Sequence, residues 1–66
     1  MNAYVVVFNA TERDGTSRVY RAVTISASRW SARVDATRGY PRAVVESVEE
    51  RLPNVNARVF MEELPN

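Results

Sequence analysis

Three residue types that perform much of protein chemistry are missing from this chain of 66 residues, which has no cysteine, no histidine and no lysine. Disulfides are therefore impossible, and zinc, haem and iron–sulfur clusters lose their usual ligands. Without lysine, no side-chain amine is available to form a Schiff base with a carbonyl substrate. We expect a protein without metals or cofactors, whose small fold depends on tight packing or on a partner chain.

The remaining polar residues give little support for catalysis. The carboxylates include the neighbouring pairs Glu49-Glu50 and Glu62-Glu63, and because neighbouring side chains point apart, such pairs are typical of a solvated face. Gly15 and Gly39 lie far apart in the chain and form no phosphate-binding loop. The sequence therefore predicts that the protein is not an enzyme.

Length and hydropathy predict a single folded domain that spans residues 1–66. Hydrophobic residues make up 45% of the chain and charged residues 26%, which is typical of globular domains rather than disordered chains. The longest apolar run, from Tyr4 to Phe8, is far shorter than the ~20 residues of a membrane span. Since the N-terminus also lacks the pattern of a secretory signal, we expect a cytoplasmic protein with no membrane partner.

All nine basic residues are arginine, and they are unevenly distributed. Residues 1–45 hold seven arginines and three acids, whereas residues 46–66 hold two arginines and five glutamates. Arginine suits contact surfaces because its planar guanidinium binds carboxylates and phosphates in a forked geometry and stacks on aromatic rings. The same usage also arises from a GC-rich coding sequence without functional meaning, so both interpretations stay open.

An antiparallel hairpin is expected near the N-terminus. Residues 3–10 and 18–26 are rich in β-branched and aromatic side chains, which favour strands, and Asp14-Gly15 between them is typical of a tight hairpin turn. The first of these segments is apolar on both faces, as in an inner strand that is covered on both sides.

The register of this hairpin follows if Asp14 and Gly15 alone form the loop. Val6 then lies opposite Val23, and Phe8 lies opposite Arg21. A slip of one residue would exchange the two faces of the second strand. The predicted core face of that strand carries Val19, Val23 and Ile25, and its opposite face carries Tyr20, Ala22 and Thr24.

Residues 28–39 are predicted to form a helix. Ser28 suits the N-cap position, and Gly39, with Pro41 beyond it, suits a left-handed residue just past the helix end. A strand is the alternative, because apolar and polar residues alternate between Arg29 and Ala36. We favour the helix because alanine and aspartate are poor strand formers.

The rest of the chain leaves one choice open. Residues 41–52 fit a helix with Val44, Val48 and Leu52 on one face, and they fit an edge strand protected by glutamates equally well. Residues 53–56 are expected to form a turn and residues 57–62 a last strand. Together these elements predict an α+β fold, in which an antiparallel sheet with an N-terminal hairpin carries one or two helices on one face.

A spaced pattern follows the expected exit from the hairpin: Ala27-Ser28, Ala32-Arg33, Ala36 and Tyr40-Pro41. Over residues 3–50, this β-hairpin–helix–strand layout resembles that of small accessory proteins encoded by bacteriophages of GC-rich hosts. These include some anti-CRISPR proteins, which block host nucleoprotein complexes. The resemblance implies a small inhibitor that binds and obstructs a host protein or nucleoprotein complex in the host cytoplasm.

Arginine combined with aromatic residues is the best candidate for a contact surface. If Ala32 and Ala36 allow the helix to pack closely on the sheet, Trp30 and Val34 are left at the rim, and an exposed tryptophan near arginine is typical of binding hot spots. The alternative is that Trp30 anchors the core. The residues predicted to bind a partner are Trp30, Arg29, Arg33, Tyr40, Arg38, Arg21 and Tyr20.

Two further functions stay open beside a binding protein that obstructs its partner. One is weak nucleic-acid binding through an Arg/Tyr surface that includes Arg18, Arg21 and Tyr20, although the net charge of only +1 is small for this role. The other is a self-assembling structural subunit. In that homodimer, the basic surface of one copy would meet the Glu-rich segment of another.

Overall fold

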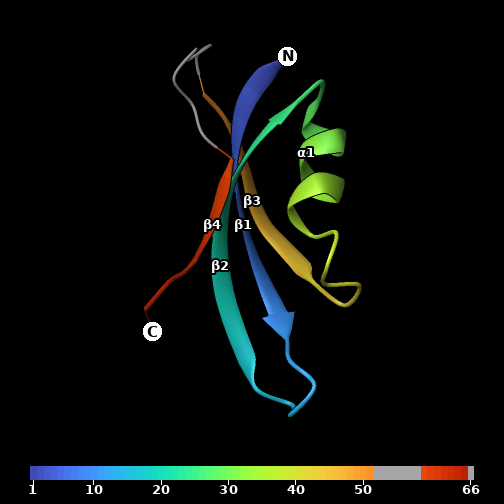
Figure 1. The fold of residues 1–66 in the computed structure, drawn as a ribbon, viewed down its shortest axis with the longest axis vertical. Coiled ribbons are helices and arrows are strands. Elements are labelled where there is room, and N and C mark those ends of the chain that lie inside the picture. Colours follow the sequence, from blue (N-terminus) through green and yellow to red (C-terminus); the bar gives the residue numbers. More distant parts are fainter. Residues whose placement is uncertain (52–58, 66) are drawn as a thin grey trace.

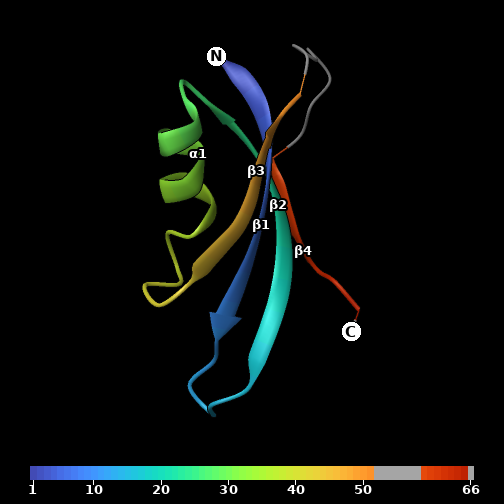
Figure 2. The same cartoon turned by 180° about the vertical axis from the view of Figure 1, so that it is seen from behind.

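The computed structural model describes residues 1–51 and 59–65. Within them, four strands form one antiparallel sheet in the order β3-β1-β2-β4, and one helix packs on it, so the α+β prediction is confirmed. Figure 1 shows the helix on one side of the strongly twisted sheet, and Figure 2 shows the same layers from behind. The elements are β1 (Asn2–Thr11), β2 (Ser17–Ser26), α1 (Arg29–Ala36), β3 (Val44–Glu50) and β4 (Phe60–Glu63).

The hairpin of β1 and β2 forms as expected, but its predicted register is wrong by one residue. Val6 lies opposite Ala22 instead of Val23, and Phe8 lies opposite Tyr20 instead of Arg21. The side chains of β1 keep their predicted faces, whereas every side chain of β2 changes face. The helix-side face of β2 therefore carries Tyr20, Ala22 and Thr24, and its open face carries Val19, Arg21, Val23 and Ile25.

The turn between the two strands explains the shift. The Glu12 N–H donates to the Thr16 carbonyl at 2.8 Å, so three residues, from Arg13 to Gly15, form the loop in place of two. Gly15 has φ 88°, a left-handed conformation that glycine adopts without strain. The Asp14 carboxylate accepts bonds from the Thr16 hydroxyl at 2.6 Å and the Thr16 N–H at 3.0 Å. These bonds hold the pKa of Asp14 below its ordinary value.

The predicted helix is confirmed, but its end differs from the expectation. Ser28 is the N-cap, and its hydroxyl oxygen accepts a bond from the Ser31 N–H at 3.1 Å. The last helical residue is Ala36, and the C-cap Thr37 donates from both its N–H and its hydroxyl to the Arg33 carbonyl, at 3.2 and 2.7 Å. Gly39 is not left-handed, and Thr37, which directly follows the last buried alanine, Ala36, already satisfies the Arg33 carbonyl.

Residues 41–52, which fitted a helix or a strand, contain strand β3. Its pairing with β1 shifts between Val7 and Phe8 of β1, and this irregularity lets both Val45 and Val48 pack against the core. The last strand begins at Phe60 and ends at Glu63, one residue later than predicted. The expected turn at 53–56 and the expected start of the last strand at 57 lie outside the described residues.

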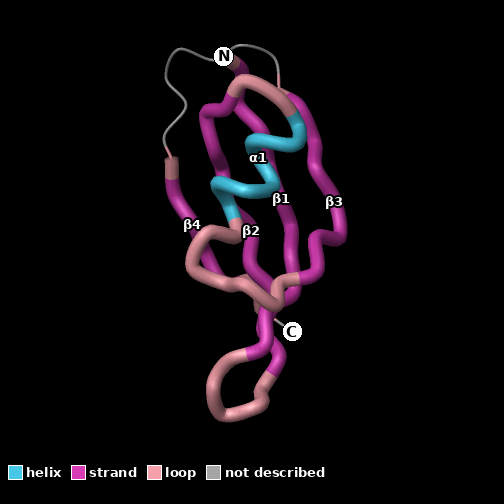
Figure 3. Tube along the Cα trace, turned by 90° about the vertical axis from the view of Figure 1, so that its right-hand side faces the viewer, coloured by secondary structure: helices cyan, strands magenta, loops and turns pink. Residues whose placement is uncertain are grey.

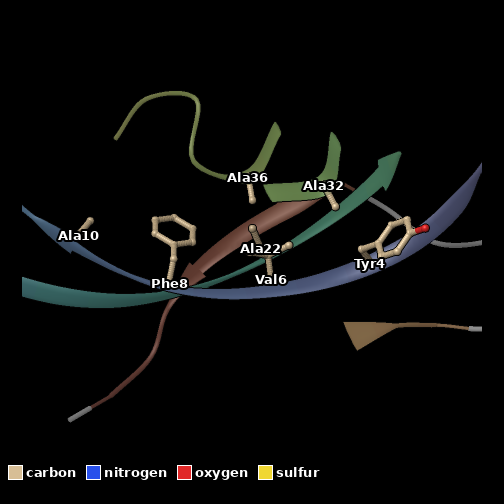
Figure 4. Close-up of a cluster of buried hydrophobic side chains, with 7 residues drawn as sticks. All are labelled: Tyr4, Val6, Phe8, Ala10, Ala22, Ala32 and Ala36. Atoms are coloured by element: carbon tan, nitrogen blue, oxygen red, sulfur yellow. The ribbon is translucent and has the colours of Figure 1, made fainter. Parts of the chain in front are cut away.

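The core lies between α1 and the inner strands β1 and β2 (Figure 3). Phe8 and Val6 are fully buried at its centre, and the ring of Phe8 lies 5.5 Å from the rings of both Tyr20 and Tyr40. Four of the seven buried members are alanines, so few large side chains hold the layers together. Figure 4 shows these residues, which are Tyr4, Val6, Phe8, Ala10, Ala22, Ala32 and Ala36.

Candidate partner-binding surface

The outward face of α1 carries an exposed tryptophan, an arginine and a valine. Trp30 is 70% exposed and Val34 is 47% exposed, and Arg33 is also exposed. Positions 30, 33 and 34 are neighbours on a helix surface because they are three and four residues apart. These three residues are called the outer-helix patch below.

The opposite face of the same helix explains why Trp30 lies outside. Ala32 is 0% exposed and Ala36 is 8% exposed, and both point at the sheet. Their small side chains let the helix approach β1 and β2 closely, which leaves no space for an indole ring between the layers. Of the two positions that the sequence left open for Trp30, an exposed site or a core anchor, the structure has the exposed one.

Arg29 begins the helix but points toward β3 instead of joining the patch. Its Nη1 atom donates to the backbone carbonyl oxygen of Val48 at 2.7 Å. In the ladder between β3 and β1, the Arg51 N–H donates to the Ala3 carbonyl at 2.8 Å. Because bonded and non-bonded pairs alternate in such a ladder, the carbonyl of Val48 points to the free edge. Arg29 therefore covers an edge group that would otherwise be open to another strand.

Arg38 lies beyond the other end of α1 and is held by Asp35. The Arg38 Nη2 atom lies 3.0 Å from Asp35 Oδ1, although the arginine side chain itself is 76% exposed. Asp35 Oδ2 in turn accepts a bond of 2.7 Å from the hydroxyl of the buried Ser26 at the end of β2. Asp35 thus ties the helix to the sheet and holds the guanidinium group of Arg38.

The other three predicted contact residues lie away from the patch. Tyr20 and Tyr40 pack on each other with ring centroids 5.2 Å apart, at the margin of the core. Arg21 lies on the face of the sheet opposite α1, where its Nε atom donates to Glu62 Oε1 at 2.7 Å. The seven predicted residues therefore do not form one surface, and the two tyrosine rings are engaged with each other and with Phe8.

Arginines of the basic N-terminal part and glutamates of the acidic C-terminal part form ion pairs within one chain. Arg21 pairs with Glu62, and Arg18 Nη1 lies 3.2 Å from Glu63 Oε2, so β4 is attached to β2 by two ion pairs. The coulombic attraction of Glu63 raises the pKa of Arg18 above its ordinary value. We expected this acidic segment to meet the basic surface of another copy, but these two glutamates are already paired inside the chain.

Tyr20 makes a hydrogen bond that the sequence did not indicate. Its hydroxyl donates to Glu12 Oε1 at 2.6 Å across the turn. This bond, and after it the loss of solvent around the ring, raises the pKa of Tyr20 well above the ordinary value of 10.0. Only the observed register reveals the contact, because the predicted register places Tyr20 on the other face.

Alkaline pH should therefore destabilise the fold. As the pH rises through about 10, Tyr20 ionises in the unfolded chain but stays protonated in the folded chain, so the free energy of unfolding falls. The difference between the tyrosinate titrations of the wild type and Tyr20→Phe isolates this group. We expect it to titrate above the ordinary value, and the variant to lose stability less steeply in this range. Titration of Tyr20 at the ordinary value would contradict the structure.

Two hollows lie near these residues. One, of about 490 Å³, is lined by the turn residues Thr11–Arg13 and by residues 39–43. The other, of about 340 Å³, lies between α1 and β4 and is lined mainly by apolar side chains such as Ala36 and Met61.

Among the described residues, no group of three or more acidic side chains is placed to hold a metal ion. The described segments contain one helix, which spans eight residues. No helix in these segments is long and apolar enough to cross a membrane.

Comparison of the chain with models of known families, with curated proteins and with solved structures gives no match.

Proposed function

We propose that the protein is a non-catalytic binding protein that covers a surface of its partner with the outer-helix patch. The observation that carries this proposal is the 70% exposure of Trp30 on a helix whose other face is tightly packed. A tryptophan held on a rigid helix can bury a large apolar area without losing much conformational freedom on binding. Binding through such a surface requires no catalytic group on the protein.

The patch also defines the chemistry of its partner. Trp30 and Val34 need an apolar pocket or groove, and Arg33 beside them suits a carboxylate at its rim. The charge of Arg38 is paired with Asp35 inside the chain, so Arg33 supplies the positive charge of this patch. A partner surface with an apolar centre and acidic margin fits these features.

The likeness of layout to small phage-encoded proteins narrows the proposal further. It points to a host protein or nucleoprotein complex as the partner, and to obstruction of that complex in the host cytoplasm as the effect. Nucleic acid is the less favourable partner, because Arg18 and Arg21 are paired with glutamates and Tyr20 and Tyr40 pack on each other. Phosphate contacts would have to replace those ion pairs.

Truncation of Trp30 tests the proposal. Trp30→Ala should weaken binding by about 30-fold, as expected for loss of a hot-spot side chain worth about 2 kcal/mol. The midpoint of thermal unfolding should stay nearly unchanged, because the ring is mostly exposed. The wild type and the variant are each attached to a resin, and the host proteins they retain are identified and then titrated in purified form.

Val44→Ala is the matched control, because Val44 is 66% exposed on β3 and does not belong to the patch. We expect it to retain the same host protein as the wild type. Equal retention by Trp30→Ala and the wild type would contradict the proposal. Retention on DNA or RNA that falls steeply with salt would instead favour the nucleic-acid function.

A further inference from the structure

The sheet face opposite α1 carries a row of apolar side chains. Residues alternate between the two faces of a strand, and the register places Val5 beside Val23 and Val23 beside Phe60. Ile25 is 41% exposed and Phe60 is 48% exposed. Within residues 1–51 and 59–65, no helix or strand lies over this face (Figures 1 and 2). The open-face patch is defined as Val5, Val7, Val23, Ile25 and Phe60.

The sequence of β1 is that of a strand with both faces covered. Val5 and Val7 on the open face are as apolar as Val6 and Phe8 on the helix side, although an antiparallel sheet with a solvated face normally alternates apolar and polar residues. The helix covers only one of the two faces. An apolar group of this kind on a sheet is typical of an interaction surface.

Two ion pairs border the open-face patch. Arg21 lies opposite Val7 and pairs with Glu62, and Glu49 lies opposite Val5 with its Oε1 atom 3.8 Å from Arg51 Nη1. Each pair is neutral as a whole, so these four charges give the face no excess of either sign. An apolar centre with a polar margin is the usual composition of a protein interface, and its balanced charge suits a surface that must face its own copy.

The open face of the sheet approaches the size of a standard interface. The Cα atoms extend 37 Å along the longest axis and 16 Å along the shortest, and Figure 3, with the shortest axis horizontal, shows the four strands side by side along it. Side chains widen this area on every side. The outline of these two extents is smaller than the ~800 Å² that each partner contributes to an interface of standard size, and the side chains bring the face closer to that size.

We propose that a second copy of this chain covers the open-face patch, with the two sheets packed face to face around a two-fold axis. Sheets packed in this way lie ~10 Å apart, with strand directions that differ by about 30°. The same residues of both copies then form the interface, as in other two-fold dimers. The helices α1 lie on the two outer surfaces, so each Trp30 faces away from the interface.

An acidic substitution in the open-face patch tests this arrangement. Ile25→Glu places two carboxylates in the dimer interface, one from each copy, and should weaken self-association by about 100-fold or more. Sedimentation velocity over a wide concentration range measures the dissociation constant. Val34→Glu is the matched control, because it makes the same kind of change at similar exposure on the outer face of α1. It should leave the dimer intact.

Two further measurements keep the test independent of the folding of one variant. Phe60→Glu changes the short outer strand β4 instead of an inner strand and should weaken the dimer as Ile25→Glu does, while circular dichroism confirms the fold. The emission of Trp30, the only tryptophan of the chain, should not change when the wild-type dimer is diluted to monomers. A wild type that stays monomeric at millimolar concentration, or a dimer that Val34→Glu dissociates and Ile25→Glu does not, would overturn the proposal.

Discussion

Replacement of Phe8 by alanine is expected to destabilise the fold more than any exposed substitution. Phe8 is 0% exposed and its ring contacts those of Tyr20 and Tyr40. Truncation of a buried phenylalanine costs about 3–5 kcal/mol, because apolar contacts are lost and a cavity remains. A domain of 66 residues has a total stability of only about 3–10 kcal/mol. The loss therefore takes a large share of the whole free energy of unfolding.

Denaturation with urea, followed by circular dichroism, measures this loss. Phe60→Ala is the control, because it makes the identical change at a phenylalanine that is 48% exposed. Both variants should be measured at low protein concentration, so that self-association does not contribute. We expect Phe60→Ala to cost far less than Phe8→Ala, and equal costs would show that Phe8 is not the centre of the core.

Ala32→Asp should detach helix α1 from the sheet. Ala32 is 0% exposed and faces the core, so an aspartate at this position would carry its charge out of solvent and among apolar side chains. An uncompensated buried charge costs about 3–5 kcal/mol. The helix is only eight residues long, and isolated helices of this length are not stable in water. We therefore expect loss of helical circular dichroism and a strong drop in the urea midpoint.

Val34→Asp separates the effect of burying a charge from the low intrinsic helix propensity of aspartate. It places the same residue two positions later in α1, where the side chain is 47% exposed and can stay hydrated. We expect a loss below about 1 kcal/mol, within the range of helix propensity alone. Similar losses for the two variants would mean that the buried face of the helix had been assigned incorrectly.

The fold class could be predicted from the sequence because the strand segments are long and strongly β-forming. The register could not, because it depended on whether the loop after Glu12 holds two residues or three, and Asp14-Gly15 suits both. One residue of loop length decides which of Tyr20 and Arg21 enters the core. The predicted register would bury Arg21. The observed register pairs Arg21 with Glu62 in solvent and packs the ring of Tyr20 against the core.

Short segments near the edges of the sheet were harder to predict for another reason. Residues 44–50 carry three glutamates and three valines, a composition that fits an exposed helix as well as an edge strand. Their conformation is decided by β1, whose free edge accepts β3, and by Arg29, which donates to Val48. Neither contact is local, so local preferences alone leave the choice open.

The candidate surface was predictable only in part. The spacing of Ala32 and Ala36 indicated one of two possible packing faces of the helix, and the position of Trp30 depended on which of them met the sheet. Composition alone could not distinguish arginines in solvent from arginines in ion pairs. Arg33 stays on the outer surface of the helix, whereas Arg21 is bound to a strand that lies 41 residues away in the sequence.

The order of strands in the sheet has a consequence for synthesis on the ribosome. The first 26 residues form the central pair, and the two strands made later lie one on each side of it. Contacts between neighbouring segments form fastest, so the nascent chain can assemble from the middle outward. Each new segment then meets an edge that is already in place, and no earlier pairing has to open to admit it.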